Sequence, residues 1–153
     1  MKHGIEPEEI NYQTMEVVSP GYPLRPEIVE STYYLYHYAV EKQAPFRRGT
    51  RPSQAAQVPP LNESPKQINA KHYQQMGAMM FRDFVKYCRT DEGYAALKSV
   101  VTKEKSDSMQ SFLFAETFKY FYLLFAPPGT LDLDKVVFNT EAHPVRRSFS
   151  AGK

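Results

Sequence analysis

SMQSFLFAETFKYFYLLF, residues Ser108 to Phe125, is the stretch that decides the fold. Its side chains are apolar on almost every face of a helix, and such a helix is predicted to be buried. The most apolar part is interrupted by Glu116, Thr117 and Lys119 and is shorter than the roughly 20 apolar residues of a membrane-spanning helix. We therefore expect a core helix here and no membrane span.

Two weaker helical patterns precede it, over Pro26–Glu41 and His72–Tyr87. Pro26 suits the first position of a helix, where its missing N–H would be unpaired in any case. In the first helix, an apolar stripe is predicted along Ile28, Leu35 and Ala39, widened by Tyr33, Tyr34, Tyr36 and Tyr38. In the second, aromatic and methionine side chains recur every three or four residues, at Tyr73, Met76, Met80, Phe84 and Tyr87. The sequence thus predicts three helices joined by irregular connections.

Composition narrows the class of protein. The chain has 153 residues, the size of one domain, and 19 basic against 17 acidic side chains give a formal charge of +2. This balance argues against a nucleic-acid or membrane-surface partner, which needs a one-sided basic field. The single cysteine, Cys88, excludes an internal disulfide framework and a Cys-rich zinc site. No secretory signal is visible at the start.

The segments outside the helices differ in composition. Residues 1–21 form a polar N-terminal segment, of which Met1–Met15 is expected to be irregular, and residues 148–153 form a polar tail. Residues 44–71 are rich in proline, which forbids a regular helix or central strand, so we interpret them as an extended or disordered insertion. Val136–Phe138 is a short apolar run that is compatible with a strand.

Three constellations could carry chemistry. The first is Leu24-Arg25-Pro26-Glu27 with Glu30, in which the two carboxylates share a helix face three residues apart. Like charges so placed are mildly destabilising unless a cation or ligand lies between them. The alternative is a solvated helix N-terminus, where the helix dipole favours carboxylates.

The second constellation is Glu116 within its apolar helix. Burying an unpaired carboxylate costs several kcal/mol, so Glu116 should have a partner or bind something. A pair with Lys119, three residues on along an exposed strip, is the alternative.

The third constellation is Asn139-Thr140-Glu141, which follows an apolar run and precedes Ala142-His143-Pro144. Threonine can offer both its hydroxyl and its carbonyl oxygen to a hard cation, which suits calcium. The spaced Asp ligands and the central Gly of an EF-hand are absent, and an ordinary polar turn is the alternative.

Together these segments resemble the C-terminal part of the class I alpha-1,2-mannosidases, glycoside hydrolase family 47. The matching strings follow the family order from Tyr22 to Pro144, and the combination is specific although each string alone is weak. The Ser-Phe-Leu-Phe-Ala-Glu string, residues 111–116, is most similar to fungal members. Residues 22–147 would then be the C-terminal part of a catalytic domain.

The resemblance implies a fold and a reaction. The fold would be all-α, a partial (α/α)7 barrel of paired helices. The reaction would be calcium-dependent, inverting hydrolysis of terminal alpha-1,2-linked mannose from high-mannose N-glycans. The resemblance places such enzymes in the lumen of the endoplasmic reticulum or Golgi.

It also implies roles for individual residues. Glu27 matches the general base, and Thr140 matches the Ca²⁺ ligand. The residues that match the lining of the mannose subsite or the calcium-bound waters are Arg25, Glu30, Phe112, Glu116 and Glu141.

The chain also departs from the family. The segments that carry the general acid and a further catalytic carboxylate have no counterpart here. Gln110 stands where Glu is usual, and His37 where Arg is usual. We therefore expect the isolated chain to be inactive and poorly folded. The alternatives are a non-catalytic, calcium-dependent glycan-binding or interaction module, and a small helical scaffold held by a partner chain.

Overall fold

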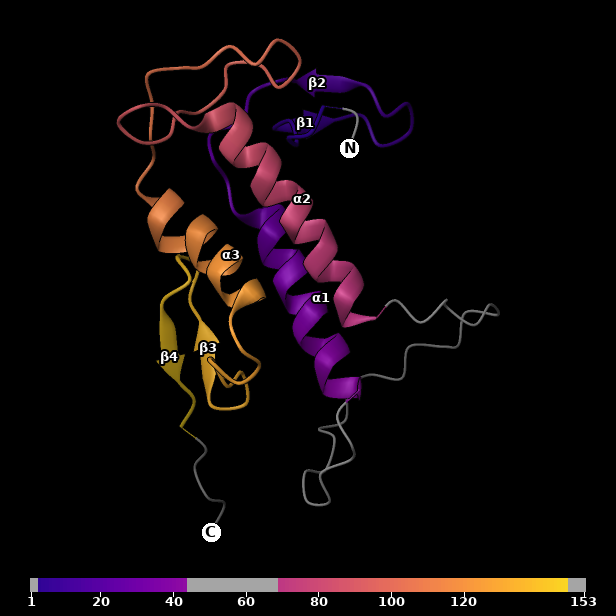
Figure 1. The fold of residues 1–153 in the computed structure, drawn as a ribbon, viewed down its shortest axis with the longest axis vertical. Coiled ribbons are helices and arrows are strands. Elements are labelled where there is room, and N and C mark those ends of the chain that lie inside the picture. The colour runs from indigo at the N-terminus through magenta and orange to yellow at the C-terminus, as the bar shows by residue number, and fades with distance from the viewer. Residues whose placement is uncertain (1–2, 44–68, 149–153) are drawn as a thin grey trace.

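The computed structural model describes residues 3–43 and 69–148 (Figure 1). Three helices dominate it: α1 (Glu27–Gln43), α2 (Ala70–Cys88) and α3 (Phe118–Phe125), the last preceded by a π-helical turn, η1 (Leu113–Thr117). Each of these helices packs on the other two. α1 and α2 lie side by side and run in opposite directions, and α3 lies along α1 (Figure 1).

Two small antiparallel hairpins flank the helices. β1 (Glu9–Ile10) pairs with β2 (Val17–Ser19), and β3 (Val136–Phe138) pairs with β4 (Pro144–Arg146). The described fold is therefore helical with few strands. The hairpin at residues 9–19 corrects the expectation of an irregular N-terminus, whereas the strand expected at Val136–Phe138 is confirmed.

α1 begins and continues as predicted, but only part of its predicted apolar face is buried. Tyr33 and Tyr36 are buried, whereas Ile28, Leu35 and Tyr38 are exposed, and Val29, which was not predicted, is buried. The large rings of Tyr33 and Tyr36 bury more area than the aliphatic side chains, so the helix turns them toward the core.

α2 follows its predicted pattern closely. Asn69 caps its N-terminus by accepting a hydrogen bond from the His72 N–H at 3.0 Å, and Met80 and Phe84 are buried. Gly77 allows α2 and α3 to approach, because a Cβ at this position would lie 2.0 Å from a methyl carbon of Leu124. The Pro-rich insertion predicted at 44–71 lies, up to residue 68, outside the described residues. Its last residues correct the predicted bound, because Asn69 caps α2 and residues 70–71 already belong to the helix.

The helix predicted over Ser108–Phe125 differs most from the structure. Residues 108–110 are not helical, η1 is a wider π-turn, and regular α-helix starts only at Phe118. The stretch is not buried all round either, because the side chains of Phe114, Tyr122 and Phe125 are exposed. No helix in the described ranges has the length and apolar character needed to cross a bilayer.

Two apolar clusters form the core. One gathers the N-terminal segment, the end of α2 and the 94–100 connection around Leu24, Phe84 and Leu113. The other joins α1, α2, α3 and the loop at Ala142 around Tyr33, Met80, Tyr120, Phe121 and Leu124. Ile5 belongs to the first cluster, so the polar N-terminal segment is anchored to the rest of the fold.

Candidate functional site

The candidate site begins at the N-terminus of α1, where the backbone is strained. Leu24 is fully buried and has φ of +69°, a left-handed conformation that leucine rarely adopts. Such a conformation costs about 1–3 kcal/mol and persists only where the surrounding structure enforces it. It turns the chain immediately before Arg25-Pro26-Glu27 and so sets the direction in which these side chains leave the backbone.

Arg25 lies between two carboxylates. Its Nε donates hydrogen bonds to both carboxylate oxygens of Glu8, at 2.8 and 3.1 Å, and its Nη1 lies 3.8 Å from an oxygen of Glu27. Glu8 was not among the predicted site residues, because nothing in its local sequence indicates a contact with a residue 17 positions away. Glu6 also lies near: burial raises its pKa, and the charge of Glu27 raises it further.

Glu30 is held by an aromatic residue of α3. The Tyr120 hydroxyl donates a hydrogen bond of 2.9 Å to Oε1 of Glu30, and the Tyr120 side chain is buried. Burial and this hydrogen bond both raise the pKa of Tyr120, so its hydroxyl keeps its proton and remains a donor. The ring of Tyr34 packs against it, with ring centroids 6.3 Å apart.

The π-turn η1 carries the next part of the site. Phe112 caps it and is half-buried, while Glu116 and Thr117 occupy its last two positions. The hydroxyl of Thr117 donates to the carbonyl oxygen of Leu24 at 2.7 Å, in the core. π-Turns inside helices are frequent at functional sites, but the apolar periodicity of the sequence did not indicate one.

Glu116 is the carboxylate on which the others converge. Partial burial raises its pKa, and the charges of Glu30, Glu27 and Glu141 raise it further, whereas Lys119 lowers it. Hydrogen bonds bring the three segments together: η1 and α3 contact the start of α1 through Thr117 and Tyr120, and the β3–β4 turn through Lys119. The Lys119 ammonium donates its hydrogen bond to the carbonyl oxygen of Ala142, at 2.6 Å, so it also ties α3 to the third segment.

The third segment is a tight turn between β3 and β4. The side-chain oxygen of Asn139 accepts hydrogen bonds from the N–H groups of Glu141, at 3.0 Å, and His143, at 2.8 Å. Ala142 has φ of +55° and is buried. Thr140 is exposed at the tip, and within residues 3–43 and 69–148 neither its hydroxyl nor its carbonyl oxygen takes part in a hydrogen bond.

These donors suit a hard cation that keeps part of its water. Among the described side chains, no group of three His, Cys, Asp or Glu residues lies close enough to enclose a metal ion alone. Thr140 nevertheless offers two uncommitted oxygens beside Glu141, and calcium accepts six to eight oxygen ligands, waters included. The donor chemistry therefore fits calcium bound by Thr140 and by waters that reach the carboxylates.

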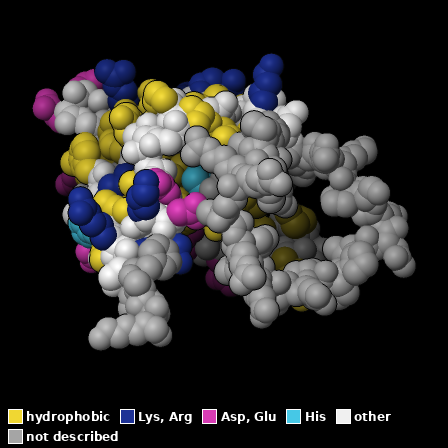
Figure 2. All heavy atoms as spheres, turned by 90° about the horizontal axis from the view of Figure 1, so that it is seen from below, with side chains coloured by type: hydrophobic (Ala, Val, Ile, Leu, Met, Phe, Trp, Pro, Cys, Tyr) yellow, Lys and Arg dark blue, Asp and Glu magenta, His cyan; other side chains and the backbone are white. Residues whose placement is uncertain are grey.

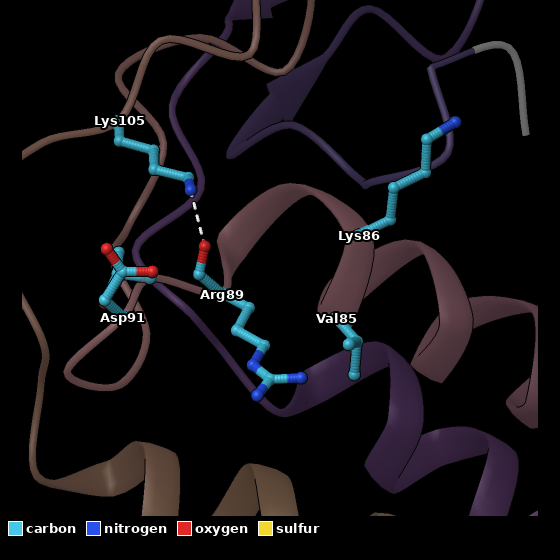
Figure 3. Close-up of a pocket in the computed structure, with 6 residues that line it drawn as sticks. Val85, Lys86, Arg89, Asp91 and Lys105 are labelled. Atoms are coloured by element: carbon cyan, nitrogen blue, oxygen red, sulfur yellow. Dashed lines mark hydrogen bonds between the residues drawn. The ribbon is translucent and has the colours of Figure 1, made fainter.

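Two cavities elsewhere contain none of the predicted site residues. One, of about 740 Å³, lies at the C-terminal end of α2, where Lys105 donates to the carbonyl oxygen of Arg89 at 2.5 Å (Figure 3). The charged groups of Lys86 and Arg89 point in different directions there and form no common anion site (Figure 3). The other, of about 470 Å³, is apolar and lies along α3.

Comparison with known proteins identifies the protein family to which the chain belongs. Residues 67–147 match the glycosyl hydrolase family 47 profile. The chain is 38% identical over 134 residues to mannosyl-oligosaccharide 1,2-alpha-mannosidase MNS1 of Arabidopsis thaliana, covering 88% of this chain and 19% of that protein. It is 33% identical to ER degradation-enhancing alpha-mannosidase-like protein 3 of Homo sapiens, over 93% of this chain and 12% of that protein.

A solved structure gives the same result. The fold matches an alpha-1,2-mannosidase from Trichoderma reesei with a TM-score of 0.60 and 29% identity, covering 85% of this chain and 22% of the other. The chain belongs to glycosyl hydrolase family 47, and the family resemblance of its three constellations is confirmed. It spans about a fifth or less of the length of these three relatives.

Proposed function

We propose that these residues form part of the active site of an alpha-1,2-mannosidase, which removes terminal alpha-1,2-linked mannose from high-mannose N-glycans with inversion. The observation that carries the proposal is that hydrogen bonds join the three distant segments: Thr117 to Leu24, Tyr120 to Glu30 and Lys119 to Ala142. The relatives are named as mannosyl-oligosaccharide 1,2-alpha-mannosidases, which supports the choice of substrate.

Glu27 is proposed as the general base. Its carboxylate is exposed, so water can reach it, and one of its oxygens lies 3.8 Å from Nη1 of Arg25. An inverting glycosidase keeps its acid and base about 6.5–9.5 Å apart to admit that water. Arg25, Glu30, Phe112, Glu116 and Glu141 would line the mannose subsite or the waters around the cation, with Phe112 offering an apolar ring and the others polar groups.

Calcium is proposed to bind at Thr140, through its hydroxyl and carbonyl oxygens. When bound, the ion would hold water and sugar hydroxyls and offset the repulsion among the carboxylates. Asn139 contributes by fixing the turn through its two accepted hydrogen bonds.

The three helices are proposed to form one section of the family's (α/α)7 barrel. The lumen of the endoplasmic reticulum or Golgi is proposed as the place of action, because one relative is named for a role in ER degradation. The general acid would lie on a section of the barrel outside these 153 residues, and its loss removes about 10²–10⁴-fold of rate.

Calorimetry tests the calcium and sugar sites directly. Titrating Ca²⁺ into the purified chain should show binding that Thr140→Val abolishes, while Thr102→Val, at an exposed threonine on another loop, leaves it unchanged. α-1,2-Mannobiose should then bind only with Ca²⁺ present. Binding of Ca²⁺ that survives Thr140→Val would contradict the assignment.

An assay of mannose release separates enzyme from binding module. We expect no release above the blank from the chain alone. Tight, calcium-dependent binding of mannobiose without turnover, unchanged by Glu27→Gln, would favour the non-catalytic glycan-binding module. Rapid release of mannose by the chain alone would contradict the placement of the general acid.

A further inference from the structure

We infer that Thr117 is a positioning residue: its hydroxyl, by holding the carbonyl oxygen of Leu24, fixes how the Arg25–Glu27 segment lies relative to Glu116. Its importance for mannose rests on the function proposed above, whereas the geometry can be tested without any ligand.

The hydrogen bond joins the two halves of the site, from a side chain of η1 to the backbone just before Arg25. Leu24 directly precedes Arg25, and Thr117 directly follows Glu116, yet the two residues lie 93 positions apart in the sequence. Both are fully buried, and the donor–acceptor distance is 2.7 Å. A movement at either end of this bond is therefore passed to the neighbouring candidate site residue.

The strained conformation of Leu24 makes this contact specific. A leucine at φ of +69° returns to an ordinary conformation unless its surroundings prevent it. The Thr117 hydroxyl gives the buried Leu24 carbonyl a partner in the strained state, and burying that carbonyl without one is unfavourable. A second hydrogen bond holds the backbone of Arg25, the residue after Leu24: the Tyr22 hydroxyl donates to the Arg25 carbonyl oxygen at 3.3 Å.

The π-helical conformation of η1 depends on the same hydrogen bond, from Thr117 to Leu24. Its wide turn closes through a hydrogen bond from the Phe118 N–H to the Leu113 carbonyl, five residues back, and regular α-helix follows at once. An α-helical register would rotate the residues of η1 relative to α3. The bond from Thr117 to a different segment secures the register in which Glu116 faces α1.

Charge repulsion opposes this arrangement. Glu27 and Glu30 on α1 and Glu141 on the β3–β4 turn all act on Glu116 with like charge, and Lys119 is the cation that partly offsets them. Repulsion tends to move η1 away from α1. The Thr117 hydroxyl resists that movement, so its removal should let Glu116 separate from Glu27 and Glu30.

Two substitutions at this position test the inference in the ligand-free chain. Thr117→Val keeps the shape and removes the hydroxyl, whereas Thr117→Ser keeps the hydroxyl. Carbon-detected NMR of the Glu116 carboxyl should show its pKa falling toward the ordinary value of 4.5 in Thr117→Val and remaining raised in Thr117→Ser. The amide signals of Arg25 and Glu27 should move in the valine variant alone.

Thr32→Val is the matched control. Thr32 is also buried and donates to a backbone carbonyl, that of Ile28, at 2.8 Å, but within α1. It should leave the Glu116 titration unchanged. A Thr117→Val variant that melts earlier yet titrates like the wild type would overturn the inference, because Thr117 would then be structural only.

If Thr117→Val does not fold, the variants Thr117→Ser and Thr117→Ala test the inference in its place. A folded serine variant with a lowered Glu116 pKa, or a folded alanine variant with a wild-type one, contradicts the inference. Because neither calcium nor sugar is present, a failure of mannobiose binding leaves this result untouched, and a failure here leaves the proposed function open to its own test.

Discussion

At the scale of single residues, Glu116 is a carboxylate with three like charges near it. Its pKa is raised by burial and by three neighbouring carboxylates. A carboxyl group with a raised pKa in the folded state stabilises the fold when protonated and loses that contribution as pH rises through the raised value. Ionised Glu116 therefore weakens the fold near neutral pH unless a cation is bound.

The substitution Glu116→Gln tests whether the ionised Glu116 side chain destabilises the fold. We expect the variant to melt at a higher temperature than the wild type at pH 7 and to lose that advantage below pH 4.5, where both side chains are neutral. Thermal unfolding followed by circular dichroism from pH 4 to pH 8, without calcium, measures the difference. A difference that stays constant across this range would show that the Glu116 charge is not the cause.

The site residues were proposed from the family resemblance, and the groups that hold them were not predicted. By spacing alone Glu27, Glu30 and Glu141 suit an ordinary helix N-terminus and a polar turn. Glu8 and Tyr120 were not predicted, since each makes its contact with a distant segment. Such contacts depend on the packing of the whole chain, and the local pattern around either residue is ordinary.

At the scale of elements, the β3–β4 turn depends on α3 for its position. Lys119 links the two by donating to the Ala142 carbonyl oxygen, and Ala142 packs into the second core cluster. Thr140 and Glu141 are therefore placed by a helix as well as by their own hairpin.

Lys119→Met should loosen that turn while leaving α3 intact. The amides of residues 139–143 are expected to exchange hydrogen for deuterium several-fold faster, because the Ala142 carbonyl loses its donor. Lys98→Met is the control, since Lys98 forms only an exposed pair with Glu104 at 2.6 Å. Equal exchange at this turn in wild type and Lys119→Met would refute the link.

Pro26 marked the start of α1 in the sequence, and the apolar period alone placed α2 close to its observed range. The Asn69 cap, which moves the start of α2 to Ala70, was not predicted. The π-turn before α3 has no such mark, because the residues of η1 suit an α-helix equally well. Tertiary contacts, including the one from Thr117 to Leu24, select the wider turn.

At the scale of the whole molecule, an apolar surface follows α3. Tyr122 is 64% exposed, Phe125 47% and Phe81 38%, and they line the cavity of about 470 Å³ with Phe118, Phe121, Ala126 and Pro127. On another face, seen from below in Figure 2, apolar side chains also reach the surface among charged ones. Contiguous apolar surface of this kind favours association.

Replacing Tyr122 and Phe125 together by lysine should reduce self-association of the chain. We expect the wild type to gain apparent mass as concentration rises, and the double variant to remain monomeric without a large loss of stability, since both side chains are already exposed. Light scattering after size-exclusion chromatography measures this. Tyr12→Lys, at a residue 80% exposed but away from α3, should behave as the wild type.

The antiparallel pairing of α1 and α2 separates two ends of the molecule. α1 has 17 residues and rises about 25 Å, so Gln43 lies that far from Glu27 along the axis. The chain leaves α1 and re-enters at Asn69 on this remote side. A reporter domain spliced between those two helices should consequently leave calcium affinity unchanged, which makes the connection a practical attachment point for labelling the protein.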